Sequence, residues 1–249
     1  MSQQHFEYHL DDFTESGYRE IIRSARSNYR FESYGTESDE PHVLWRHDVD
    51  FSPHRAARLA EIEADEGVRA TYFVLLHSEF YNWLEADVTG RFRQIADLGH
   101  DLGLHFDASF YAPYAEQAAL AEALDFERSL LERIFGRDVR AFSFHNPDVG
   151  DALQFDADEI AGMVNAYGRG TKERYAYCSD SNGYWRFHRL SEFLESGHVF
   201  AQVLTHPEWW TPSAMMPRDR VQRAIDGRAA ATAAGYDELL ARIGRHNAR

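Results

Sequence analysis

The sequence His47-Asp48-Val49-Asp50 decides the fold, because it lies where an apolar segment ends and a helix begins. The residues before it, 43–45, read Val-Leu-Trp and are typical of a short buried strand. Ser52 is a good N-cap, and Pro53 suits the first helical turn, where a missing N–H costs nothing. We therefore expect two carboxylates and an imidazole at the C-terminal end of a strand, the edge where α/β folds bind ligands.

Asp48 and Asp50 are two residues apart on an extended segment, so their side chains are expected on the same face. Two carboxylates that lie this close raise each other's pKa unless a cation or a proton joins them. The pair therefore indicates either a metal or catalytic site, or carboxylates that cap the following helix or bind a nearby arginine. The motif alone does not choose between these two interpretations.

Four further apolar segments end in the same types of residue. They are residues 101–107 with His105 and Asp107, residues 139–147 with His145, residues 175–180 with Asp180, and residues 199–207 with His206. One histidine at a strand end is commonly structural, whereas five strand ends that carry His or Asp indicate a shared site. These side chains converge in space if the strands run parallel in one sheet or barrel.

Alternation of strands and helices along the chain predicts that parallel arrangement. Helices are expected at residues 13–27, 53–64, 89–98, 116–135, 155–164, 190–196 and 215–249, with the strands between them. Aromatic connections at 77–87, 110–114 and 209–210 directly follow strand ends. Their rings either stack on the apolar face of a sugar or anchor the loops by packing.

The composition excludes several classes of function. A net charge of −15 argues against binding to nucleic acid, which needs a basic surface, and against adhesion to anionic lipid. The sequence shows no run of eighteen apolar residues and no secretion leader, so we expect a soluble, cytoplasmic protein without membrane insertion. Cys178 is the only cysteine, which excludes an internal disulfide, and its aromatic strand favours packing over nucleophilic catalysis.

In their order and spacing, the motifs resemble those of the polysaccharide deacetylase family, the NodB-homology or carbohydrate esterase 4-like group. The resemblance covers about residues 43–207. Its pieces are 47–50 for the first motif, 70–74 for the strand that follows, 99–105 for the metal-binding histidine motif, 142–147 for the third, Asp180 with Trp185 for the fourth, and 204–206 for the fifth. Each piece is weak by itself, and their succession makes the resemblance specific.

The resemblance implies a distorted (β/α) barrel, NodB-like, with N-terminal and C-terminal helical additions, as one domain over residues 1–249 with its core at about 41–212. It implies metal-assisted hydrolysis of an N-acetyl or O-acyl group on a sugar. By position, Asp48 would be the general base, Asp50 and His105 would hold a divalent cation, and His206 would be the general acid. Zinc accepts such ligands, and histidine is the acid best matched to neutral pH. Asp180, Trp185, Arg186 and Trp209 are the expected substrate contacts.

Three departures from the family pattern alter this assignment. Ser109 stands where the family has its second ligand histidine, and Val49 separates aspartates that are usually adjacent. The third motif lacks its arginine and offers His145 instead. We favour His145 over Asp107 as the residue that completes the metal shell; the other interpretation is a weak or absent metal. The missing arginine has three candidate replacements, Arg46, Arg169 and Arg186.

The expected function is that of a cytoplasmic metal-dependent deacetylase acting on an acylated amino-sugar, for example a nucleotide- or lipid-linked polysaccharide precursor. Two alternatives stay open at this point. One is a metal-independent C–N hydrolase on the same scaffold, acting for example on a cyclic ureide. The other is a catalytically inactive, carbohydrate-binding relative.

Overall fold

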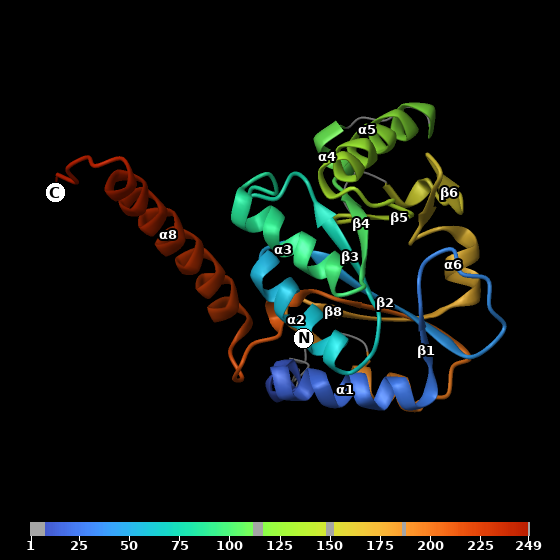
Figure 1. Ribbon diagram of the computed structural model, residues 1–249. Coiled ribbons are helices and arrows are strands. Elements are labelled where there is room, and N and C mark those ends of the chain that lie inside the picture. The colour runs from blue at the N-terminus through green and yellow to red at the C-terminus, as the bar shows by residue number, and fades with distance from the viewer. Residues whose placement is uncertain (1–7, 112–116, 148–151, 186–187, 249) are drawn as a thin grey trace, which may run out of the picture.

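A central sheet, surrounded by helices, forms the body of the molecule, and one long helix, α8, extends away from it (Figure 1). The computed structural model describes residues 8–111, 117–147, 152–185 and 188–248. Within these residues, no helix is both long enough and apolar enough to cross a membrane.

The elements alternate along most of the chain. The strands are β1 (Arg30–Glu32), β2 (His42–Val49), β3 (Thr71–Leu75), β4 (Asp101–Phe106), β5 (Ala141–Phe144), β6 (Glu159–Ile160), β7 (Met163–Asn165), β8 (Ala176–Ser181), β9 (Tyr184–Trp185) and β10 (Phe200–Thr205). The α-helices are α1 (Glu15–Asn28), α2 (Pro53–Asp65), α3 (Ala86–Asp97), α4 (Ala108–Tyr111), α5 (Gln117–Phe135), α6 (Arg169–Arg174), α7 (Leu190–Glu195) and α8 (Pro217–Arg242). Short 3₁₀ turns lie at Leu10–Phe13, Ala152–Gln154 and Pro207–Trp209.

The strand order is β6-β7-β5-β4-β3-β2-β10-β8-β9, with β1 paired to β2 beside this path. All neighbours from β7 to β8 are parallel, and only β6 and β9 pair antiparallel with their neighbours. The sheet curls strongly enough for Tyr167, just after β7, to accept a hydrogen bond from Arg46 of β2 across the interior, at 2.9 Å. The predicted α/β fold, a distorted barrel with helical additions at both ends, is confirmed.

Strand β2 shows why the barrel has two different sides. Val43, Trp45 and Val49 belong to the main apolar core under the helices. The alternating residues point to the interior, where Leu44 packs with Phe73 in a second, smaller cluster. All eight residues of the strand are buried, because helices cover one face and the closing sheet covers the other.

The helix α2 begins as the sequence predicts. The Ser52 hydroxyl accepts a hydrogen bond from the backbone N–H of Arg55, and Pro53 occupies the first turn. Such a cap satisfies one of the unpaired N–H groups at a helix start. The cap fixes the direction in which the chain leaves β2, and so fixes where Asp50 lies at the strand end.

The prediction of a helix over residues 155–164 is wrong. This segment contains the short antiparallel hairpin of β6 and β7. Ala161 and Gly162, between the two strands, have φ angles of 52° and 69°, in the left-handed region. Two consecutive left-handed residues form the tight turn that matches strand twist, and they interrupt any right-handed helix.

Gly103 in β4 is the glycine that the packing of the sheet requires. A Cβ at this position would lie 2.5 Å from the Phe73 ring and 3.2 Å from the Ala141 carbonyl oxygen. We expect Gly103→Ala to lower the free energy of unfolding by about 1–3 kcal/mol, as overpacking does. Urea denaturation checks this, with Gly90→Ala as the control, since a Cβ on that α3 glycine meets nothing within 4 Å. Equal stability of the Gly103 variant and the wild type would contradict the packing described.

Candidate metal centre

The parallel strands bring the predicted site residues to one edge of the sheet. Asp48 lies near the end of β2 and Asp50 just beyond it, His105 lies in β4, and His145 and His206 directly follow β5 and β10. In register, the last residue of β3 is level with His105, and the last residue of β10 is level with residue 47 of β2. Strand ends that are level in this way place their side chains around a common point.

Asp50, His105 and His145 are the three residues that could hold a metal ion among those the structure describes, with ligand atoms within 4.8 Å of one another. Asp50 Oδ1 lies 3.2 Å from His105 Nε2 and 3.5 Å from His145 Nδ1. The two ring nitrogens are 3.2 Å apart. Asp50 Oδ1 is buried without a hydrogen-bond partner. One carboxylate oxygen and two imidazole nitrogens that converge in this way fit zinc or a similar divalent cation.

Ser143 orients His105 from behind. His105 Nδ1 lies 2.8 Å from Ser143 Oγ and 3.3 Å from the Ser143 carbonyl oxygen. Nδ1–H therefore donates to Ser143, which leaves the lone pair on Nε2 directed at Asp50. Ser143 Oγ in turn donates to Asp48 Oδ1 at 3.3 Å. Such partners fix the tautomer and the ring orientation of ligand histidines.

His145 is positioned by the turn that follows β5. Its backbone N–H donates to the Phe106 carbonyl oxygen, and Asn146 adopts the left-handed conformation with φ of 44°. Asparagine tolerates that conformation better than most residues. The Asn146 amide nitrogen, Nδ2, lies 2.8 Å from His145 Nε2 and donates to it in this orientation of the amide. When the amide is turned by 180°, its oxygen accepts Nε2–H instead, and Nδ1 then has its lone pair for a cation.

The electrostatics of Asp50 favour its ionised form. Burial alone would raise the pKa of this carboxyl group, but the adjacent imidazoles of His105 and His145 and the nearby charge of His206 outweigh burial. Together they hold the pKa of Asp50 well below its usual value. The carboxylate is therefore charged at neutral pH, as a metal ligand must be.

Asp48 lies beneath this group and is only 2% exposed. Its Oδ2 atom is 3.7 Å from His105 Nε2 and accepts a hydrogen bond from Arg46 NH2 at 3.2 Å. The Arg46 guanidinium is fully buried and also lies over the Phe73 ring, 5.5 Å from its centroid. The arginine partner offsets part of the desolvation cost of burying this carboxylate.

Of the three arginines considered as replacements for the missing family arginine, Arg46 is the one beside Asp48. Arg169 forms an ion pair with Asp156, and both side chains are exposed. Arg186 lies outside the described residues.

His206 reaches the site from β10 with a carboxylate behind it. Its Nδ1 atom lies 2.5 Å from Asp180 Oδ1, and its Nε2 atom lies 3.8 Å from Asp50 Oδ2. Asp180 Oδ2 also accepts hydrogen bonds from Thr205 Oγ1 and from the His206 backbone N–H. Burial would lower the pKa of His206, but the charges of Asp180 and Asp50 outweigh it and hold the pKa well above its usual value. A protonated histidine thus faces the site.

Beside these groups opens a pocket of about 290 Å³. It is lined by Asp50, Phe51, Leu75, His77, Ser78, Glu79, Phe80, Asp107, Ser109, His145 and Asn146. The rings of Phe51 and Phe80 lie 4.2 Å apart between their centroids. A wall of aromatic rings with hydroxyl, amide and carboxylate groups around it suits a polar ligand that has an apolar face.

Three predicted substrate contacts are placed elsewhere. Asp180 is buried behind His206 and orients it, so it does not line the pocket. The Trp185 indole donates to Asp12 and stacks on Phe13, because β9 turns this ring toward the N-terminal segment. Trp209 is buried and contacts the edge of Phe51, so it supports the pocket wall from behind. The fourth, Arg186, falls in the segment already noted as undescribed.

The expectation that the first motif delivers its imidazole to the site is wrong. His47 alternates with Asp48 on β2, so its ring points to the opposite face of the sheet. There His47 Nε2 lies 2.7 Å from Glu63 of α2, and Tyr72 donates to the same carboxylate at 2.6 Å. All three side chains are fully buried. This histidine therefore joins strand β2 to the covering helix.

Cys178 is buried within β8, as its aromatic surroundings in the sequence suggest. Burial, with a smaller contribution from Asp180, raises the pKa of its thiol to about 12. A thiol that stays protonated at neutral pH is a poor nucleophile.

No protein-family model matches this chain, and no curated protein matches it. Solved structures do. A family 4 carbohydrate esterase from Bacillus anthracis is 13% identical, with 84% of this chain and 85% of that chain covered and a TM-score of 0.44. The catalytic domain of peptidoglycan N-acetylglucosamine deacetylase from Eubacterium rectale is 16% identical, with coverages of 83% and 90% and a TM-score of 0.45.

A family 4 pseudoenzyme from Bacillus anthracis is also similar, at 16% identity and a TM-score of 0.43, over 78% of this chain and 61% of that chain. The likeness is one of fold. The chemistry of this chain has to be inferred from its own side chains.

Proposed function

We propose that this protein is a metal-dependent hydrolase that removes an acyl group, foremost an N-acetyl group, from a sugar or a sugar-containing polysaccharide precursor. One observation carries the proposal. The candidate metal-ligand group of Asp50, His105 and His145 contacts a buried carboxylate, Asp48, through His105, and a histidine with a carboxylate partner, His206, through Asp50. Metal-assisted hydrolysis of an amide uses a cation site, a base and an acid in one place, and these residues are suited to all three roles.

The proposed roles follow from the charges of the groups. A divalent cation, when bound, supplies Lewis acidity toward the acyl oxygen and toward water. Asp48, which accepts a hydrogen bond from Arg46, is placed to accept the proton of the attacking water. His206 donates its Nε2 proton to the departing amine, while Asp180 stabilises the imidazolium form and holds the ring in place.

The pocket supports a sugar as the substrate. Phe51 and Phe80 offer ring faces to the apolar side of a pyranose, and Glu79, Asp107 and Asn146 offer polar groups to its hydroxyls. The same wall would suit other flat ligands with polar edges. Measured turnover of candidate substrates therefore has to identify the substrate.

The test is acetate release from a panel of N-acetylated and O-acetylated sugars by protein loaded with zinc, beside the same protein treated with a chelator. We expect release that disappears on chelation and returns when metal is added. Acetate release that survives exhaustive chelation would contradict the proposal and indicate a metal-independent C–N hydrolase. Sugar binding without any release would replace it with a binding protein.

Asp180→Asn tests the role of the carboxylate behind His206. Because the amide cannot stabilise imidazolium as a carboxylate does, we expect kcat to fall by about 10²-fold, within the range of general acid catalysis, with KM little changed. Thr205→Val is the control, since it removes a hydroxyl that donates to Asp180 while leaving the carboxylate–histidine contact. Steady-state kinetics with an amide substrate measure the effect, and an unchanged kcat for Asp180→Asn would exclude this role.

A further inference from the structure

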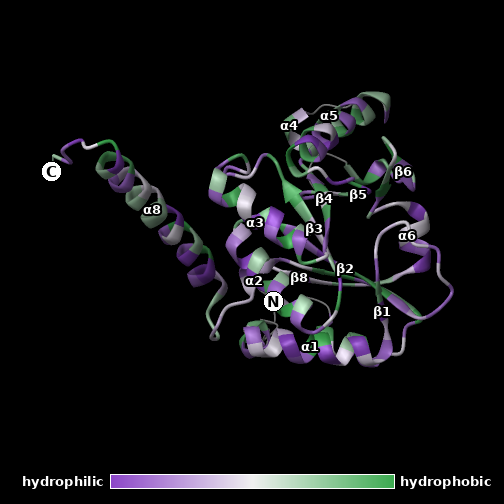
Figure 2. Cartoon of the chain, in the orientation of Figure 1, coloured by the Kyte–Doolittle hydropathy of each residue, from purple (hydrophilic) through white to green (hydrophobic). Residues whose placement is uncertain are grey.

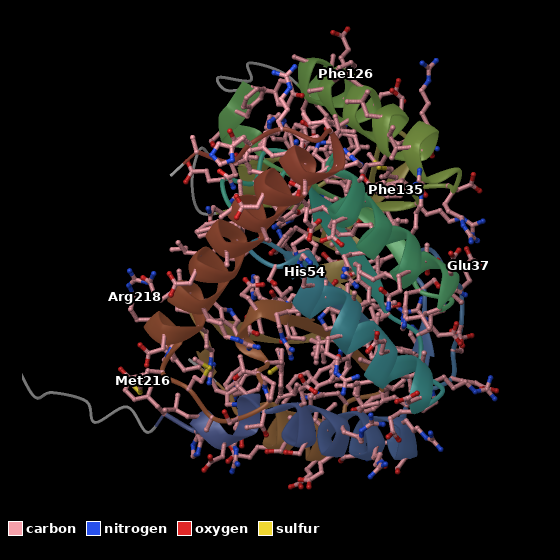
Figure 3. All side chains as sticks on the ribbon, turned by 60° about the vertical axis from the view of Figure 1, so that its left-hand side comes forward. Glu37, His54, Phe126, Phe135, Met216 and Arg218 are labelled. Carbon is pink, nitrogen blue, oxygen red and sulfur yellow. The ribbon has the colours of Figure 1, made fainter. Side chains whose placement is uncertain are left out.

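Helix α5 buries one charged residue within its apolar face. The buried residues of this helix recur at spacings of four, three and four residues, and they are Leu120, Leu124, Glu127 and Leu131. Glu127 is 1% exposed, whereas its neighbour Phe126, labelled on α5 in Figure 3, is 56% exposed. Figure 2 shows apolar and polar residues alternating around this helix. A carboxyl group in a buried apolar row costs free energy unless it has partners.

The partner of Glu127 is a histidine of the pocket beside the candidate metal centre. His77 Nε2 lies 2.6 Å from Glu127 Oε1. Burial raises the pKa of Glu127 above its usual value, although the contacts with Tyr111 and His77 oppose that shift. These partners therefore offset the cost of burial only in part. The His77 ring is also stacked on the ring of Phe110, with 3.7 Å between the ring centroids.

The free edge of the His77 ring lies at the pocket. His77 follows the end of β3 by two residues and lines the same pocket as Asp50 and His145. Its side chain is 22% exposed, and among the described residues Glu127 engages Nε2 while Nδ1 has no hydrogen bond. The next residue, Ser78, donates from its hydroxyl to the Asp50 carbonyl oxygen at 2.8 Å. That bond fixes the loop of His77 relative to the candidate metal ligands.

The charges around the pocket indicate which group His77 Nδ1 binds. Glu79 and Asp107 line the same pocket, so they repel an anionic group of a ligand. A hydroxyl group meets no such repulsion. It can donate to Nδ1 or accept from it, and it therefore suits either tautomer of the ring. A sugar offers several hydroxyl groups to such an edge.

We propose that His77 is a specificity-determining residue that binds one hydroxyl group of the sugar substrate through Nδ1, and that Glu127 is the positioning residue that holds its ring. Phe110 covers one face of the ring and leaves its edge for the ligand. The inference rests on the proposed function for the class of ligand, a sugar, and does not depend on the hydrolytic step. A purely structural pair would only fasten α5 to the loop after β3.

Sugar binding, measured apart from turnover, tests the role of His77. Calorimetric titration of zinc-loaded protein that carries Asp48→Asn, with N-acetylglucosamine oligosaccharides of one to four units as probes, gives the dissociation constants. Adding His77→Ala should weaken binding by about 3–10-fold, the order expected for one lost hydrogen bond. His54→Ala is the matched control and should leave binding unchanged, because His54 pairs with Asp87 outside this pocket. Unchanged affinity after His77→Ala, or no binding of any probe to the parent protein, would overturn the proposal.

Glu127→Leu separates a positioning role from a structural one. Leucine continues the apolar face of α5, and replacement of a buried ion pair by apolar residues is often neutral or stabilising. We therefore expect a midpoint of thermal unfolding that is equal or higher, together with sugar affinity that is lower by about 3-fold or more, since the His77 ring is no longer held. Lower stability with unchanged sugar affinity would show that the pair is only structural.

Monodeoxy sugars identify the hydroxyl group that His77 binds. One monodeoxy analogue of the tightest probe should bind the parent protein as weakly as the complete sugar binds the His77→Ala variant. That variant should not distinguish the analogue from the complete sugar, because both partners of one contact are then tested together. Acetate release is not measured here, so failure of the proposed hydrolysis leaves this result intact. If every analogue loses the same factor in both proteins, His77 contacts no hydroxyl group and the proposal is wrong.

Discussion

Replacing Asp48 by Asn should lower kcat by about 10²–10⁴-fold, the range for loss of a general base. The substitution keeps the volume of the side chain, and the amide oxygen can still accept the hydrogen bond from Arg46, but the amide nitrogen cannot accept one from Ser143, and the proton acceptor is removed. The metal content should not change, because Asp48 is not one of the three ligand residues. Turnover measured beside elemental analysis of the same preparation gives both results.

Asp107→Asn is the matched control for this experiment. Asp107 is a second carboxylate that lines the pocket, and it accepts its hydrogen bonds from Ser109. Because Asp107 is placed to bind substrate hydroxyls and not to accept the proton of water, its variant should retain most of kcat, and any loss should appear in KM. Full turnover in Asp48→Asn would show that Asp48 is not the general base. Loss of metal in that variant would show that Asp48 is a metal ligand.

His145→Ala should weaken metal binding by more than about 100-fold. A loss of about 100-fold is the upper end when the removed residue only supports a metal ligand, and we propose that His145 is itself a ligand. His145 Nδ1 is one of only two imidazole nitrogens in the group, so the variant leaves His105 and Asp50 alone with the cation. Binding of zinc to the apoprotein, followed by competition with a chromophoric chelator, measures the change.

The same measurement decides between the two residues that could complete the metal shell. Ser109 occupies the position of the missing family histidine, and Asp107 is two residues away from it. If Asp107→Ala binds zinc as the wild type does while His145→Ala does not, His145 is the third ligand. Full zinc affinity in His145→Ala would exclude it.

The convergence of the site was predictable from the sequence because parallel strands end at one edge. Each apolar segment that closes on His or Asp fixes one side chain at that edge, and only the order of the strands remained open. Alternation along β5 also places Ser143 on the face of His145, so the partner of His105 could have been found from that pattern. The alternation of side chains along a strand depends only on the strand itself, so it can be read from the sequence without knowing the tertiary contacts.

What the sequence did not predict depends on contacts between distant segments. Trp185 was expected at the substrate, but its partner Asp12 lies 173 positions away, and no local pattern indicates that pairing. Asp180 was expected at the substrate as well, and its hydrogen bonds to β10 show that it orients His206. The hairpin at Ala161 was missed because an alanine in the left-handed conformation is rare.

Elemental analysis of the untagged wild-type protein beside His105→Ala tests the central claim most directly. Asp50, His105 and His145 should hold about one zinc or similar divalent ion per chain, and the variant should hold none. His100→Ala is the control and should keep its metal, since that histidine is also buried but contacts the Ala60 carbonyl oxygen away from the site. A wild-type protein that binds no divalent ion even when metal is supplied, or a His105→Ala variant that keeps its full complement, would contradict the account.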